Sequence, residues 1–393
     1  MQSQVEQGLF AGISTLVARR NKIVHYEQVG YRNRESKAPM QRDTLFRIYS
    51  MTKPIICTAF MHLCEQGQCD LLDPVSNYIP AFAQLKVLEK DATGVERLVD
   101  LKQPVTIQHL LTHTSGLVYD IYEDFSVNDL YRKNNLLSDA QRTLEEVINK
   151  LCQLPLAFQP GTQWHYSLSI DVIARLIEII ANKPLDQFLQ EIIFIPLGMK
   201  DTAFYLPEEK RSRLATMYGG VDFCGVDVTW TKIVNAWSQK INERMDISAS
   251  SPIDNPNFRR GGYGLVSTVE DFFRFSQMLL NQGQLDGKRI LSRKTLELMH
   301  MNHLPSEFLP IGFASDAKLM GYGFGLGSRV MVDVAKSGII GSVGEYGWAG
   351  AAKTYYWIDP KEELIGLFFT QAMLNFSMIL RHFQTLVYQA IID

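Results

Sequence analysis

Ser50 and Lys53 are the first residues whose spacing could do chemistry, because they form an S-x-x-K motif. On a helix, residues three apart share one face, so the lysine amine can reach the serine hydroxyl and activate it as a nucleophile. Apolar residues after Ser50 recur at three- and four-residue spacing, which predicts a helix that begins where its dipole favours developing negative charge. The alternative role of Ser50 is an ordinary helix N-cap. A second copy of the motif, Ser315 to Lys318, lies in a glycine-rich stretch without a predicted helix.

Tyr166 is the next candidate, because it lies in a loop after Pro160-Gly161 and just before a predicted helix. Lowering the pKa of a free phenol from about 10 to about 7 takes roughly 4 kcal/mol. A lysine ammonium at about 4 Å supplies about that much in a partly screened site. Lys53 beside Tyr166 would therefore make the phenol a base. The alternative is a half-buried tyrosine that bonds a backbone carbonyl.

A third cluster, residues 344–352, is rich in glycine and alanine and precedes a predicted strand. Small residues let a ligand approach the backbone closely. The N–H of Ala351 could then pair with the N–H of Ser50 to bind an oxyanion, and Trp348 could form a wall of the substrate pocket. The alternative is a tight turn that caps the sheet edge and packs the tryptophan.

Other catalytic motifs are missing from the sequence. No G-x-S-x-G is present, which excludes the nucleophile elbow of α/β-hydrolases, and no G-x-x-x-x-G-K-[ST] phosphate loop occurs. His109 and His113 are four apart and His300 and His303 three apart, but neither pair belongs to an H-E-x-x-H motif. We expect structural histidines and neither a metal nor an organic cofactor.

Periodicity predicts the elements that must position these residues. Residues of β-forming type or alternating polarity predict strands over 13–18, 23–29, 353–358 and 364–370. Three- and four-residue spacing predicts helices over 50–67, 169–182 and 383–391.

Strands at both ends and helices in the middle predict an α/β fold of α+β type, with one sheet built from both termini and an inserted helical lobe. We place the α/β lobe in residues 1–75 and 260–393 and the mostly helical lobe in 76–259. The active site is expected between the two lobes.

Composition restricts the classes of partner. The chain has 393 residues, of which 46% are hydrophobic, and this excludes disorder. With 39 basic and 42 acidic residues, the net charge of -3 favours neither nucleic acid nor an anionic membrane. We expect a small-molecule partner, with a homo-oligomer left open.

Targeting signals and cysteines point to the cytoplasm. The sequence contains no apolar run long enough to span a membrane. Glu6 precedes the apolar run near the N-terminus and Arg19-Arg20 follows it, the reverse of a secretory signal. Five cysteines are too few and too oddly numbered for a disulfide framework, so we expect reduced thiols and a cytoplasmic protein. A mature protein with a trimmed leader would look the same.

Taken together, the motifs occur in an order that resembles the serine β-lactamase-like family, most of all its class C β-lactamase-related carboxylesterases (family VIII esterases). The motifs that carry this resemblance are Ser50-x-x-Lys53, the segment 110–117 (LLTHTSGL), Pro160-Gly161 leading to Tyr166-Ser167, and Gly347-Trp348-Ala349-Gly350.

The resemblance implies an antiparallel sheet flanked by helices and a role for each motif. Ser50 would be the nucleophile, Lys53 and Tyr166 the proton-handling pair, and the amides of Ser50 and Ala351 the oxyanion hole. The residues that it implies for substrate contact are Trp348, Gly350, Leu168 and Tyr119.

Two departures from the family pattern bear on the substrate. Leu168 stands where class C β-lactamases carry the asparagine of Y-x-N. Lys353-Thr354 begins like the K-T-G of these enzymes but continues with Tyr355 and is displaced from Trp348. A cation for a β-lactam carboxylate is thus missing from its usual place, which disfavours efficient β-lactamase activity.

We therefore expect a serine hydrolase that cleaves small, fairly apolar carboxylic esters through an acyl-enzyme on Ser50. The alternatives on the same scaffold are a β-lactamase, an amidase or peptidase, and an acyltransferase. A non-catalytic penicillin-binding-like module is a further alternative. The presence of Ser50, Lys53 and Tyr166 together argues against it, because a catalytically inactive relative need not retain all three.

Overall fold

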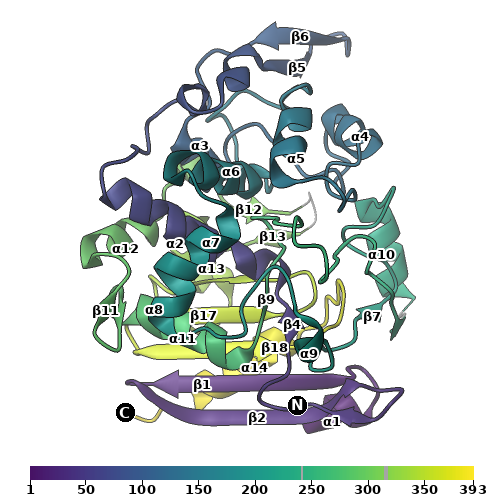
Figure 1. The fold of residues 1–393 in the computed structure, drawn as a ribbon, viewed down its shortest axis with the longest axis vertical. Helices are drawn as coiled ribbons and strands as arrows, with labels where there is room; N and C mark the ends of the chain where they lie inside the picture. Colours follow the sequence, from purple (N-terminus) through teal and green to yellow (C-terminus); the bar gives the residue numbers. More distant parts are fainter. Residues whose placement is uncertain (240–241, 314–316) are drawn as a thin grey trace.

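A central eight-stranded antiparallel sheet organises the computed structural model, which describes residues 1–239, 242–313 and 317–393 (Figure 1). The strand order is β14-β15-β16-β17-β18-β1-β2-β3. Its strands are β1 (Gly12–Arg19), β2 (Lys22–Asn33), β3 (Ala38–Pro39), β14 (Tyr322–Phe324), β15 (Arg329–Met331), β16 (Tyr346–Ala349), β17 (Tyr355–Asp359) and β18 (Leu364–Phe369). Because β1 pairs with β18, strands from the two ends of the chain are neighbours in one sheet.

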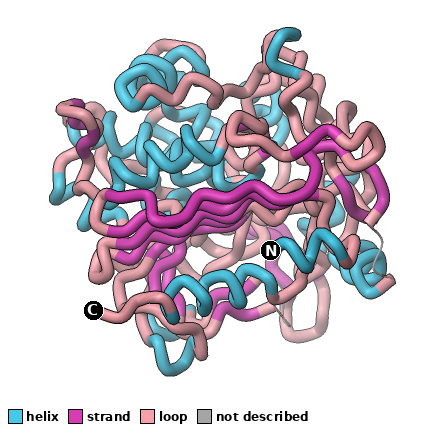
Figure 2. The backbone as a smooth tube through the Cα atoms, turned by 90° about the horizontal axis from the view of Figure 1, so that it is seen from below, coloured by secondary structure: helices cyan, strands magenta, loops and turns pink. Residues whose placement is uncertain are grey.

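Both faces of the sheet are buried at β17 and β18, as the alternation of their side chains shows. Trp357 and Phe368 pack on one face with Phe383 of helix α14 (Ile379–Gln389). Ile358 and Leu367 point to the other face and join the main hydrophobic core. Figure 2 shows the sheet close to edge-on, with helices on both sides.

The remaining elements surround this sheet. The other helices are α1 (Gln2–Glu6), α2 (Thr52–Glu65), α3 (Ile107–Leu111), α4 (Ser126–Lys133), α5 (Leu144–Leu151), α6 (Ser169–Ala181), α7 (Leu185–Leu189), α8 (Ile195–Leu197), α9 (Glu208–Arg211), α10 (Trp230–Ser238), α11 (Val269–Leu280), α12 (Arg293–Met299) and α13 (Val334–Ser337). Single helical turns are η1 (Tyr49–Met51), η2 (Val75–Asn77), η3 (Pro80–Gln84), η4 (Gln190–Phe194) and η5 (Ser306–Phe308). Short strands pair as β4 (Phe46–Arg47) with β9 (Val266–Ser267), β5 (Lys86–Lys90) with β6 (Glu96–Asp100), β7 (Tyr218–Gly219) with β8 (Glu243–Arg244), β10 (Gln284–Leu285) with β11 (Lys288–Arg289), and β12 (Ile311–Gly312) with β13 (Lys318–Leu319).

The predicted fold class is confirmed: an antiparallel sheet built from both termini, flanking helices and a mostly helical insertion. In Figure 1, helices α3 to α6 of this insertion lie beyond α2, on the side away from the strands of the sheet. The division at residues 75/76 and 259/260 stays a prediction. None of the helices in the described ranges has the length and apolar character that a membrane crossing requires.

Two local expectations differ from the structure. The helix after Ser50 begins at Thr52 and is preceded by the tight turn η1, which contains Ser50 itself. The small-residue cluster is not a turn at the sheet edge, because its residues 346–349 form β16 between β15 and β17. No alternation marks this strand in the sequence, because Tyr346, Gly347 and Trp348 are all buried. Ser315 lies outside the described residues.

Candidate active site

Ser50 and Lys53 are brought together by the turn η1 and the start of α2. Ser50 is 6% exposed, and its Oγ lies 3.2 Å from the Nζ of Lys53. Thr52 Oγ1 accepts a hydrogen bond of 3.1 Å from the N–H of Leu265, which ties this helix start to a distant segment. The spacing in the S-x-x-K motif thus places the amine against the hydroxyl, as the sequence predicted.

Burial decides the protonation state of Lys53. Desolvation lowers the pKa of Lys53 to about 7, and the nearby carboxylate of Asp171 opposes this only in part. Two further atoms lie within hydrogen-bond distance of Nζ: the carbonyl oxygen of Gly262 at 2.7 Å and the hydroxyl of Tyr119 at 3.0 Å.

A neutral amine fits these three neighbours. It has two N–H groups, which can be donated to the Gly262 carbonyl and the Tyr119 oxygen, and one lone pair. The lone pair then faces Ser50 Oγ and can accept its proton. The geometry therefore presents Lys53 as a general base.

Tyr166 lies beside this pair, in the loop before α6. The Lys53 amine is 4.6 Å from the centre of its ring, and its hydroxyl accepts a hydrogen bond of 3.0 Å from Nε1 of Trp348. Burial nevertheless raises the pKa of Tyr166 above its ordinary value, and the hydrogen bonds with Ser50 and Trp348 only offset part of this rise. The expectation that Lys53 lowers this pKa to about 7 is therefore wrong, because the same burial that removes water from the phenol also removes the charge from the lysine.

The turn after β16 is held tightly against the residue that precedes η1. Thr354 Oγ1 donates a hydrogen bond of 3.2 Å to the carbonyl of Ile48, and a Cβ at Gly350 would lie only 2.4 Å from the same oxygen. Glycine at 350 permits this close approach, which brings Ala351 to the Ser50 side of the turn. Ser50 and Ala351, whose amides are the predicted oxyanion hole, line one cavity.

The cavity at Ser50 has a volume of about 220 Å³. Ser50, Tyr166, Trp348, Gly350 and Ala351 all line it. Its other apolar wall residues are Ile121, Tyr122, Phe223, Trp230, Phe313, Ala349, Leu374, Phe376 and Leu380.

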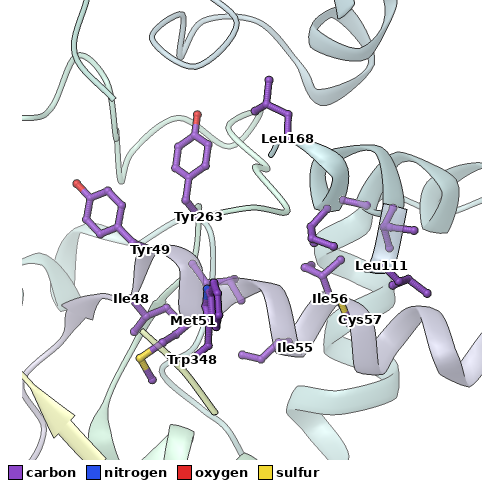
Figure 3. Close-up of a cluster of buried hydrophobic side chains, with 14 of the residues drawn as sticks. Ile48, Tyr49, Met51, Ile55, Ile56, Cys57, Leu111, Leu168, Tyr263 and Trp348 are labelled. Atoms are coloured by element: carbon purple, nitrogen blue, oxygen red, sulfur yellow. The ribbon is translucent and has the colours of Figure 1, made fainter. Parts of the chain in front are cut away.

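Leu168 and Tyr119 are not among the described residues that line this cavity. Leu168 is 2% exposed, and Figure 3 shows it in the buried hydrophobic cluster, well separated from Trp348. Tyr119 is fully buried beneath the cavity, where its hydroxyl meets Lys53. Both residues support the site rather than form the cavity wall.

Sequence reasoning missed the polar support beneath Lys53. Asp171 accepts a hydrogen bond of 3.1 Å from the N–H of Gly262, the residue whose carbonyl meets Lys53. A Cβ at Gly262 would lie 2.7 Å from Asp171 Oδ2 and 2.9 Å from the Tyr119 hydroxyl. The available signal was an aspartate among apolar residues in the first turn of α6, but helix N-termini commonly carry aspartate.

Lys353 also reaches the cavity wall, although the sequence placed it away from the Trp348 motif. Its Nζ donates hydrogen bonds to the carbonyl oxygens of Asn375 at 2.6 Å and Ser377 at 2.7 Å. Burial lowers its pKa to about 7. Its donors are thus directed at backbone rather than at a ligand carboxylate.

The described residues contain no group of three histidine, cysteine, aspartate or glutamate side chains that could hold a metal ion. Three of the histidines make local contacts. His109 accepts a hydrogen bond from the N–H of Thr106, His113 bonds Ser167, and His300 stacks on Tyr346.

A serine hydroxyl faced by a buried amine, with a phenol beside it at one cavity, is the arrangement of a serine hydrolase. The family model described as Beta-lactamase matches residues 1–387. The chain belongs to the beta-lactamase family, and the resemblance read from its motifs is confirmed.

Relatives in this family include esterases. Protein Rv1367c of Mycobacterium tuberculosis is 34% identical over 376 residues, which cover 95% of this chain and 88% of that protein. Esterase EstB of Burkholderia gladioli is 28% identical over 355 residues, covering 88% and 82% of the two chains. Among solved structures, "EstCE1, a hydrolase with promiscuous acyltransferase activity" is 27% identical with a TM-score of 0.79, covering 98% of this chain and 96% of that one.

Proposed function

We propose that the protein is a carboxylesterase that hydrolyses neutral, apolar esters through an acyl-enzyme on Ser50. The observation that carries this proposal is the character of the cavity wall. Aromatic and aliphatic side chains dominate it, and Lys353, the one cation among the described residues that line it, donates to two backbone carbonyls. Such a wall favours an apolar ester over a substrate with a carboxylate.

Acylation follows from the hydrogen bonds of Lys53. The neutral amine takes the proton of Ser50 as Oγ attacks the ester carbonyl carbon, and the N–H groups of Ser50 and Ala351 hold the resulting oxyanion. Tyr166 keeps its proton at neutral pH and donates it to the leaving alkoxide oxygen. The Lys53 ammonium then returns a proton to Tyr166.

Deacylation uses the same groups. A water molecule replaces the departed alcohol. It loses a proton to the Lys53 amine and attacks the acyl carbonyl carbon. Collapse of the second oxyanion intermediate releases the carboxylic acid and returns the proton to Ser50 Oγ.

The test compares p-nitrophenyl butyrate with the cephalosporin nitrocefin on one preparation, with Ser50→Ala as the control. We expect a kcat/KM for the ester at least a hundredfold above that for nitrocefin, and loss of both activities in the control. Equal turnover of the two substrates would instead make the protein a β-lactamase.

The site of acylation is tested separately. After incubation with a fluorophosphonate, peptide mass mapping should place the adduct on the peptide that contains Ser50. An adduct on the peptide that contains Ser315 would overturn the assignment of the nucleophile.

Acyl transfer to an alcohol is the second candidate function. The apolar cavity favours an alcohol over water as the acyl acceptor, and EstCE1 is described as having acyltransferase activity. Adding a primary alcohol during ester turnover distinguishes the two reactions, because transfer forms a new ester and hydrolysis forms only the acid.

A further inference from the structure

A second cavity of about 500 Å³ adjoins the one at Ser50. It lies between α10, the loop 370–378 and the N-terminal segment, and its apolar wall includes Phe10, Ile233, Ala236, Trp237 and Met373. Nothing in the catalytic steps described above uses this space.

The two cavities share part of their wall. Leu374 and Asn375 line both of them. Phe376 lines the cavity at Ser50, and its ring centre lies 5.7 Å from that of Trp230 in the same cavity and 5.6 Å from that of Trp237 in the second. The ring of Phe376 therefore stands at the border between them.

The backbone of Phe376 is fixed on both sides, whereas its ring is partly exposed. Lys353 bonds the carbonyls of Asn375 and Ser377, one residue to each side, which fixes the main chain at this point. The side chains of Phe376 and Trp237 remain 38% and 44% exposed. Such large exposed rings beside a catalytic cavity are typical of a surface that an apolar ligand covers.

The volumes of the two cavities also indicate that one ligand occupies both. The cavity at Ser50, about 220 Å³, falls below the roughly 300–1,000 Å³ of ordinary small-molecule sites. The two cavities taken together fall inside that range.

We propose that the acyl chain of the ester runs from Ser50 past Phe376 into this second cavity, so that the enzyme selects esters of medium- to long-chain fatty acids. The proposal rests on the esterase function argued above. We assign the acyl chain rather than the alcohol to the second cavity because of one hydrogen bond. Leu374, which lines both cavities, donates a hydrogen bond of 2.7 Å to the carbonyl of Ala351, whose N–H we assign to the oxyanion hole. The alcohol leaves toward Tyr166.

The test measures kcat/KM for p-nitrophenyl acetate and p-nitrophenyl octanoate in the wild type and three variants. Ala236→Trp fills the second cavity, Trp237→Ala removes part of its wall, and Asn235→Trp is the matched control on an exposed position of the same helix. In the wild type we expect kcat/KM to rise with chain length, by up to about fourfold for each fully buried methylene.

Ala236→Trp should lower the octanoate-to-acetate ratio at least tenfold with acetate turnover unchanged, and Asn235→Trp should leave both values unchanged. Trp237→Ala should lower the ratio severalfold, which keeps the proposal testable if Ala236→Trp does not fold. A wild-type profile that peaks at acetate, or a ratio unaffected by both cavity variants, overturns the proposal.

Octyl acetate tests whether the second cavity binds the alcohol chain of the ester. Its kcat/KM should respond to neither cavity variant, and a selective loss would mean that the second cavity takes the alcohol chain. If acetate is not hydrolysed at all, the proposed esterase function fails, which is distinct from the failure of chain selection.

Discussion

At the scale of residues, burial affects the pKa values of the active-site groups more than neighbouring charges do. Lys53 and Tyr166 are both buried, and desolvation favours the neutral form of each. An ammonium that would acidify the phenol is thus itself lost near neutral pH. The site holds a neutral base and a protonated phenol, which are the two forms that acylation requires.

The pH dependence of activity should report the protonation of Lys53. Below a pH of about 7 the amine is protonated and cannot accept the Ser50 proton, so kcat/KM for a neutral ester should fall about tenfold for each pH unit. Above this pH it should reach a plateau. A pH–rate profile from pH 5.5 to 9 with p-nitrophenyl butyrate checks this, and a flat profile would contradict it.

Trp348 should contribute through its N–H and not only through its ring. Trp348→Phe keeps an aromatic wall but removes the donor to Tyr166, so kcat should fall roughly two- to tenfold, the size of one neutral hydrogen bond. In a Tyr166→Phe background the same substitution should cost nothing more. Kinetics of the two single variants and the double variant give this comparison; an equal loss in both backgrounds would indicate a packing role alone.

At the scale of elements, the active site depends on the junction between the turn after β16 and the residue before η1. Thr354 and Gly350 both meet the carbonyl of Ile48, and Ser50 and Ala351 lie one or two residues from this contact. Small shifts of the turn would therefore change the distance between the two amides that we propose as the oxyanion hole.

Gly350→Ala should impair both catalysis and stability. The added Cβ would lie 2.3 Å from Thr354 Oγ1 and 2.4 Å from the Ile48 oxygen, so the turn must move away from η1. We expect at least a tenfold loss of kcat and a destabilisation of about 1–3 kcal/mol. Ester kinetics and urea unfolding of the same preparation test this, and unchanged kcat would show that the close approach is not needed.

At the scale of the whole molecule, strands from the two ends of the chain pair with each other in the sheet. Strand β1 pairs with β18, and α14 covers the outer face of both. Phe383 of α14 packs against Trp357 and Phe368 with ring centres 5.7 and 5.9 Å apart. The C-terminal helix therefore belongs to the core on that face.

Phe383→Ala should destabilise the protein by about 3–5 kcal/mol, the usual cost of a cavity left by a buried phenylalanine. Leu386→Ala on the same helix is the matched control, because this leucine is 58% exposed, and it should cost less than about 1 kcal/mol. Urea unfolding measures both. Equal effects would mean that α14 is not part of the cooperative core.

The sequence by itself determined the elements and the local geometry of the nucleophile. Periodic burial is a local property, so the first hairpin, α2, α6, the last two strands and α14 could be predicted to within a few residues. The contact between Ser50 and Lys53 was predictable for the same reason, since a helical turn places residues three apart side by side.

Only the tertiary structure decided how the site is charged and where a substrate can go. The pKa of Lys53 depends first on its burial and then on the charge of Asp171, which is far from it in the sequence. The bond from Trp348 to Tyr166 and the cavities on either side of Phe376 likewise join distant segments. Desolvation and cavity shape depend on everything that packs around a group, and no local pattern of residues carries that information.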